Sequence, residues 1–160
     1  MSAWLRRAGS GRNPDGSNVT WSLSEGERGR RWRWTVIDDG AVRHAGLVEI
    51  DPSDRFARLE LASPAGLLIL HPEPDGRSIH GNVVTTDGVR PLSFDWSRSA
   101  AVAIAGDPFG TAILRADGAR ATLVIRPRLG VVAGDGGQAL DLDSRGVPTL
   151  ANSREWPLES

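Results

Sequence analysis

The stretch RWRWTVIDDGAVRHAGLVEI, residues 31–50, decides the fold class. Trp32, Trp34 and Val36 alternate with arginine and threonine, which is the period of two expected for a strand with one buried face. The Asp-Asp-Gly at residues 38–40 favours a tight hairpin turn, because glycine adopts positive φ at little cost. A second apolar run follows directly. The stretch therefore predicts two antiparallel strands joined by a short turn.

The same alternation recurs along most of the chain. Short apolar runs are separated by turn residues at intervals of roughly 8–12 positions, a spacing typical of all-β sandwiches and barrels. Residues 111–116, TAILRA, fit the strand pattern, and the only helix expected is a turn or two near residues 97–101. Hairpins joined in sequence imply an antiparallel meander. We therefore predict an all-β fold of about ten strands that forms a barrel or a strongly curved half-barrel.

The 160 residues favour a single domain with a sizeable core. Residues 1–16 are rich in Gly, Ser and Arg, and we predict that they form a flexible N-terminal tail. Residues 17–150 carry the alternating pattern and are predicted to form one β-barrel-like domain. Residues 151–160 are predicted to form a C-terminal tail.

The residue types that are missing exclude several kinds of chemistry. The chain contains no Cys and no Tyr, and all 19 of its basic residues are Arg. Thiolate nucleophiles, disulfides, a Schiff-base lysine and a P-loop lysine are therefore excluded. No motif implies a cofactor, and no metal site is expected. The use of Arg without Lys indicates a bacterium with a GC-rich genome.

Charge and hydropathy indicate the cellular setting. The net charge of −1 provides no overall attraction to nucleic acid or to an anionic membrane. The arginine cluster at residues 28–34 offers phosphate contacts and base stacking, but arginine on a solvated strand face is the simpler interpretation. No window approaches the roughly 18 apolar residues of a membrane helix, and residues 1–16 lack the apolar segment of a signal peptide. We therefore expect a cytoplasmic protein with no nucleic-acid partner and no membrane insertion.

Aromatic and aliphatic side chains are predicted to share one face of the sheet. The residues assigned to this face are Trp32, Trp34, Val42, His44, Val48, Leu92, Phe94 and Trp96. Aromatic rings give a large contact area with little loss of rotamer freedom, so such a face suits an apolar ligand. Ordinary core packing is the alternative interpretation.

Two of the three histidines flank one turn, in LILHPEPDGRSIHGNVV at residues 68–84. If the turn centres on residues 74–75, His71 lies opposite Ser78, and His71 and His80 become diagonal neighbours on one face, roughly 7–8 Å apart. Asn82 continues that face, and Gly81 indicates a bulge or a close approach of two backbones. We predict that His71, His80 and Asn82 point inward and orient a ligand within an apolar pocket.

Three other roles for the histidine pair stay open. His71 or His80 can perform acid–base chemistry, because histidine titrates near neutral pH. A metal-binding pair is disfavoured by the small number of histidines and by the absence of a ligand motif. A histidine bonded to the turn at the end of its strand is the structural alternative.

Two segments resemble the bacterial glycolipid-binding protein family. DPFGTAILR keeps Pro108, Phe109, Thr111, Leu114 and Arg115 of a family stretch that runs Pro-Phe-Thr-Asn-Thr followed by apolar residues and Arg. LDLDSRGVPTL is similar to the family's closing turn at Asp143, Gly146 and Val147. The resemblance covers mainly residues 31–115 and the C-terminal end, and the chain lacks the Asn and the paired Arg of the central motif. It implies a cytosolic, curved antiparallel sheet with an apolar, lipid-like ligand.

Three functional hypotheses follow. The leading one is the binding of a hydrophobic or lipid-like small molecule by the aromatic-lined, concave face of the barrel. The second is a cofactor-free isomerase or cyclase of secondary metabolism on the same scaffold, with His71 or His80 as the acid–base. The third is a structural or protein-interaction module with a fully packed core.

Overall fold

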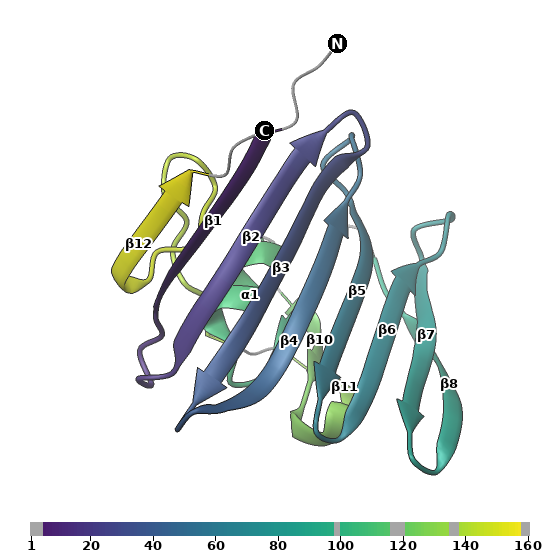
Figure 1. Ribbon diagram of the computed structural model, residues 1–160. Helices are drawn as coiled ribbons and strands as arrows, with labels where there is room; N and C mark the ends of the chain where they lie inside the picture. The colour runs from purple at the N-terminus through teal and green to yellow at the C-terminus, as the bar shows by residue number, and fades with distance from the viewer. Residues whose placement is uncertain (1–4, 98–99, 116–120, 135–137, 158–160) are drawn as a thin grey trace.

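The computed structural model describes residues 5–97, 100–115, 121–134 and 138–157. Most of the described chain is antiparallel β structure, which confirms the predicted all-β class. One nine-stranded sheet forms the front layer in Figure 1, and a three-stranded sheet with one helix lies behind it. We call the face of the large sheet that meets this second layer the inner face, and the opposite face the outer face.

The large sheet contains nine strands in the order β12-β1-β2-β3-β4-β5-β6-β7-β8. Their bounds are β1 Leu5–Arg12, β2 Asn18–Gly26, β3 Gly29–Asp38, β4 Ala41–Ile50, β5 Phe56–Ser63, β6 Gly66–Pro72, β7 Ser78–Thr85, β8 Gly88–Asp95 and β12 Ala151–Pro157. The small sheet has the order β11-β10-β9, with β9 Ala101–Ile104, β10 Ala121–Ile125 and β11 Val131–Ala133.

The predicted hairpins are present. Asp39 and Gly40 have φ values of 49° and 75°, which is the positive-φ pair that a tight two-residue hairpin turn requires. Asp38 pairs with Ala41 across that turn. The period-two pattern of residues 31–50 therefore forms the β3–β4 hairpin that the sequence predicts.

Both ends of the chain differ from the prediction. Leu5–Arg12, expected within a flexible tail, form β1, and Ala151–Pro157, expected as a second tail, form β12. β1 pairs along its length with β2 and, on its other side, with β12. Both segments have weak apolar patterns and are held by backbone hydrogen bonds to a neighbouring strand. Such pairing cannot be predicted from the alternation of apolar residues alone. Residues 1–4 and 158–160 lie outside the described residues.

The large sheet is open in the described part of the chain. Its edge strands, β8 and β12, each pair with only one neighbour, so the predicted barrel closure is not found. Within the small sheet, β9 and β10 run parallel, which departs from a pure antiparallel meander. A parallel pair needs a crossover connection, and helix α1, Pro108–Leu114, lies in that crossover.

Helix α1 replaces the strand predicted at residues 111–116. Pro108 occupies its first turn, and the Asp107 side chain caps it by accepting a hydrogen bond from the Gly110 backbone N–H. All seven residues of α1 are buried, so the segment has no polar face and shows no helical period in the sequence. No helix near residues 97–101 appears among the described residues, and residues 98–99 lie outside them. Within the described ranges, no helix has the length and apolar character needed to span a membrane.

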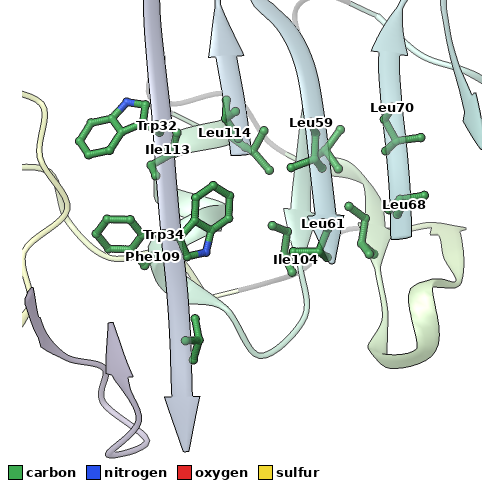
Figure 2. Packing of buried hydrophobic residues seen from close by; sticks show 14 of the residues in the cluster. Trp32, Trp34, Leu59, Leu61, Leu68, Leu70, Ile104, Phe109, Ile113 and Leu114 are labelled. Carbon is green, nitrogen blue, oxygen red and sulfur yellow. The ribbon is translucent and has the colours of Figure 1, made fainter. Parts of the chain in front are cut away.

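The core lies between the inner face and the second layer. Phe109 of α1 packs against three indole rings of the large sheet, with centroid distances of 6.5 Å to Trp21, 6.1 Å to Trp32 and 6.2 Å to Trp34. Figure 2 shows these residues of β3 and α1 in one cluster with the leucines of β5 and β6 and with Ile104 of β9. Helix α1 therefore covers the aromatic side chains of β3, with Phe109 packed against their rings.

Candidate functional site

Asp107 is a fully buried carboxylate at the start of α1, with no solvent-exposed side-chain surface. Its Oδ2 accepts a hydrogen bond from Trp34 Nε1 at 2.7 Å and lies 2.6 Å from His44 Nε2. Its Oδ1 accepts from the Gly110 backbone N–H at 2.9 Å. A buried carboxylate is stable only when its oxygens are paired, and three donors from three elements meet that need. Asp107 therefore fixes α1 to the inner face of β3 and β4.

A β-bulge directs His44 toward Asp107. Val36 of β3 pairs with His44, whereas the next residue, Ile37, pairs with Val42, so Arg43 is an extra residue on β4. The bulge leaves Val42 52% exposed while His44 is buried. Val42, predicted to share the inner face with His44, is therefore turned outward. Bulges of this kind are frequent beside functional sites, where they re-aim a side chain.

The contact with Asp107 determines which His44 nitrogen carries a proton. An ionised carboxylate accepts hydrogen bonds but cannot donate them, so Nε2 is the donor of the 2.6 Å contact. In the neutral imidazole, Nδ1 then holds a free lone pair. Within the described ranges, no residue forms a hydrogen bond with Nδ1. A histidine oriented by a buried carboxylate, with no hydrogen bond from any described residue to its second nitrogen, has the geometry of a general acid–base.

His44 lines a surface pocket of about 650 Å³, which we call the His44 pocket. Its walls come from the β4 bulge, the β5–β6 turn, the connection from β9 to α1 and the segment around the short 3-10 helix η1, Pro127–Leu129. The lining residues are Arg43, His44, Leu61, 63–65, 104–106 and 126–129. Ligand pockets measure roughly 300–1,000 Å³ and are mostly apolar with a few polar groups. The His44 pocket matches both criteria.

Arg43 is held at one side of this pocket by two carboxylates. Its guanidinium donates to Asp15 Oδ2 at 2.9 Å and to Asp38 Oδ2 at 2.6 Å, which raises the pKa of Arg43. Hydrogen bonds from Ser17, followed by the bond from Arg43, lower the pKa of Asp15 to about 2. Arg43 is thus a fixed part of the β4 bulge, and its charge is already balanced.

No protein-family model, no curated protein and no solved structure matches the chain. The residues and their geometry are therefore the basis for any functional assignment.

The predicted aromatic residues all lie on the inner face. Trp32 and Trp34 are buried against α1, and Trp96 is buried against Phe56 at a centroid distance of 6.2 Å. Phe94 is partly buried and packs against the same core. His44 is the only one of the predicted site residues among those that line the His44 pocket, and it meets Trp34 through Asp107.

His71, His80 and Asn82 lie together on the outer face, not inward as predicted. The inward residues of β7 are Ile79, Gly81 and Val83, whereas His80 is exposed. A Cβ on Gly81 would lie 1.7 Å from the Ile69 carbonyl oxygen, which confirms the predicted close approach of two backbones. The strand period therefore places the histidines on the face of the sheet opposite to His44, and none of them lines the His44 pocket.

The histidine pair forms a small surface cluster of its own. His71 and His80 pair directly across β6 and β7, and their rings stack with centroids 5.2 Å apart. His80 Nδ1 lies 2.7 Å from Glu73 Oε1. Burial, the Arg58 charge and His80 lower the pKa of His71. No group of three or more His, Asp and Glu side chains suitable for a metal ion occurs among the described residues.

The sequence prediction omitted Asp107 and the arginines around the His44 pocket. The Asp-Pro pair at residues 107–108 is a helix-start signal, since Asp is a favoured N-cap and Pro is favoured at the first helical position. That signal would have identified the helix start and a backbone-bonded carboxylate. Nothing local in the sequence indicates that His44, 63 positions earlier, lies against this carboxylate.

Proposed function

We propose that this protein binds a small, mostly apolar molecule in the His44 pocket. The observation that carries the proposal is a pocket of about 650 Å³ with a mostly apolar lining, in which the buried Asp107 orients His44. Phe109 packs against Trp32 and Trp34 and so occupies the predicted site on the aromatic face. We therefore place the ligand in the His44 pocket instead. The family resemblance implies a lipid-like ligand, and an apolar pocket supports that class.

Binding is tested by titration with N-phenyl-1-naphthylamine, an uncharged apolar dye whose fluorescence rises on leaving water. We expect saturable binding at one site per chain. Ala65 lies in the β5–β6 turn and lines the pocket, so Ala65→Phe should fill the space and abolish binding. Ala62→Phe is the matched control, because Ala62 is an exposed residue of β5 that does not line the pocket.

Two outcomes would contradict this proposal. One is the absence of saturable binding, which would favour a structural or protein-interaction module. The other is equal binding by Ala65→Phe and Ala62→Phe, which would place the dye elsewhere on the surface. Retained folding of both variants is checked by their unfolding curves in urea.

Acid–base catalysis on the bound molecule is the second candidate function, and the His44–Asp107 contact favours it. The sequence predicted His71 or His80 as the acid–base. We now assign this role to His44, because His44 lines the pocket and its Nδ1 has no hydrogen-bond partner among the described residues. Nδ1 would take a proton from a carbon next to a carbonyl group, leaving an enolate. It would exchange that proton for a deuteron of the D2O solvent and return the deuteron to the same carbon.

The test is exchange of the α-protons of 2-decanone in D2O, followed by NMR. Catalysis is supported if the unmodified protein raises the exchange rate above that in buffer and His44→Gln abolishes this increase. The His44→Gln variant must still bind the dye. Exchange at the buffer rate in the unmodified protein contradicts it and leaves binding alone.

A further inference from the structure

The charged side chains that line the His44 pocket are all arginines. Its lining contains three arginines, Arg43, Arg126 and Arg128, and no acidic residue. Arg43 is bound by Asp15 and Asp38. Arg126 and Arg128 are exposed, and neither forms an ion pair with any residue that the structure describes. The pocket therefore combines an apolar interior with two cationic side chains at its margin.

An unusual backbone segment carries these two arginines. Arg128 and Leu129 have φ values of 68° and 63°, in the left-handed region that residues other than glycine seldom adopt. The Arg126 N–H donates to the Gly130 carbonyl at 2.7 Å, and the Leu129 N–H donates to the Arg126 carbonyl at 3.0 Å. Leu129 is buried in the core, which anchors the segment. Strained backbone of this kind is concentrated at sites where a protein positions side chains for a ligand.

We propose that the His44 pocket takes an aliphatic molecule that ends in a single anionic group. The chain would lie against the apolar walls, at Leu61, Ile104 and Leu129, and the anion would lie at Arg126 and Arg128. Arginine is the side chain best suited to this role, because its planar donor fork matches carboxylate and phosphate oxygens. The inference rests on the proposed binding function and adds the chemical class of the ligand.

The test compares probes of equal chain length by isothermal titration calorimetry. Decanoate and decyl phosphate carry an anion, decanol is uncharged, decyltrimethylammonium is cationic, and acetate is an anion without a chain. We expect decanoate to bind about tenfold more tightly than decanol, which corresponds to about 1.4 kcal/mol. Decyltrimethylammonium should bind more weakly than decanol, and acetate should not bind. Comparison of decanoate with decyl phosphate identifies which anionic group the site prefers.

The arginines are tested by an Arg126→Gln/Arg128→Gln double variant. The double variant should bind decanoate only as tightly as it binds decanol. Arg33→Gln is the matched control, because Arg33 is an exposed arginine on the outer face of β3, away from the pocket. The preference for decanoate should also fall as sodium chloride is raised, because salt screens exposed charges.

Each remaining outcome overturns a defined part of the inference. Equal binding of decanoate and decanol would contradict the anionic ligand class and leave the proposed binding function intact. A decanoate preference that persists in the double variant would show that these arginines do not supply it. Binding of acetate as tight as that of decanoate would indicate a site for free anions. Binding of no probe would contradict both proposals.

Discussion

His44 Nε2 lies 2.6 Å from Asp107 Oδ2, although the two residues are 63 positions apart in the chain. The contact joins a bulged strand of the large sheet to the first turn of the only helix longer than a single turn in the described residues. Trp34 donates to the same oxygen. One carboxylate oxygen therefore links two strands and a helix at the edge of the His44 pocket.

The first prediction concerns the Asp107 oxygen that carries these two contacts. Asp107→Asn keeps a favoured helix cap, but an amide that turns its oxygen toward Gly110 leaves its nitrogen facing Trp34. At least one buried donor then loses its acceptor. We expect the free energy of unfolding in urea to fall by about 1–3 kcal/mol. Asp87→Asn, at an exposed hairpin turn that accepts either residue, should change it by less than about 0.5 kcal/mol. Equal effects of the two substitutions would contradict this role for Asp107.

The second prediction compares two buried tryptophans. Trp34→Phe and Trp96→Phe remove the same atoms, but Trp34 Nε1 donates to Asp107, whereas Trp96 Nε1 has no partner among the described residues. Trp34→Phe should therefore lower the free energy of unfolding by about 1–3 kcal/mol more than Trp96→Phe does. Unfolding is followed by circular dichroism, because fluorescence changes when a tryptophan is removed. Losses of equal size would show that the Trp34 hydrogen bond contributes nothing.

The third prediction concerns the close approach of β6 and β7 at Gly81. An alanine Cβ there would lie 1.7 Å from the Ile69 carbonyl oxygen, and a backbone atom cannot move aside as a flexible side chain can. Gly81→Ala should lower the free energy of unfolding by about 1–3 kcal/mol or more. Gly130→Ala is the control, since Gly130 has φ of −73° and no atom lies within 4 Å of the position that an alanine Cβ would occupy. That change should be neutral or stabilising by up to about 1 kcal/mol. A tolerated Gly81→Ala would contradict the observed strand contact.

The fourth prediction is a pH dependence of stability due to His71. Burial, together with Arg58 and His80, lowers the pKa of His71 in the folded protein below 6.5. As the pH falls through 6.5, the unfolded chain takes up the proton before the folded protein does. The contribution of His71 to the free energy of unfolding is therefore at its full value above pH 6.5. It is lost as the pH falls from 6.5 through the folded-state pKa of His71. Urea unfolding between pH 7.5 and 5 should show a weaker dependence on pH in His71→Gln than in the unmodified protein.

An NMR titration of the His71 ring gives an independent measurement for this prediction. A folded-state pKa at or above 6.5 would contradict it. So would an identical pH dependence of unfolding in the variant and the unmodified protein.

The sequence allows the strand pattern to be predicted, but not the irregularities in it. Period-two alternation identifies the β3–β4 hairpin and places Trp32 and Trp34 on the inner face. The β6–β7 turn centres on residues 75–76 and not 74–75, because Gly76 takes a φ of 69°. That shift changes the partner of His71 from Ser78 to His80. It leaves both histidines on one face, since a displacement by two residues preserves the side.

The candidate site was harder to predict than the strands because it depends on long-range contacts. His44 was expected on the inner face, but the bulge that separates it from Val42 leaves no clear pattern in the sequence. A fully buried helix shows no amphipathic period, so α1 resembled another strand. Period two places the histidines at residues 71 and 80 on one face, but it does not indicate which face of the sheet meets α1.

The order of elements along the chain has a consequence for synthesis on the ribosome. Strands β1 to β8 are complete once Asp95 has been made, but α1 and the small sheet follow only afterwards, and β12 comes last. Until then, the nascent chain presents the tryptophans of β2 and β3 to water and lacks the partner for the outer edge of β1. Exposed apolar surface and an unpaired strand edge are the features that chaperones bind. The large sheet is therefore completed only after β12 has left the ribosome.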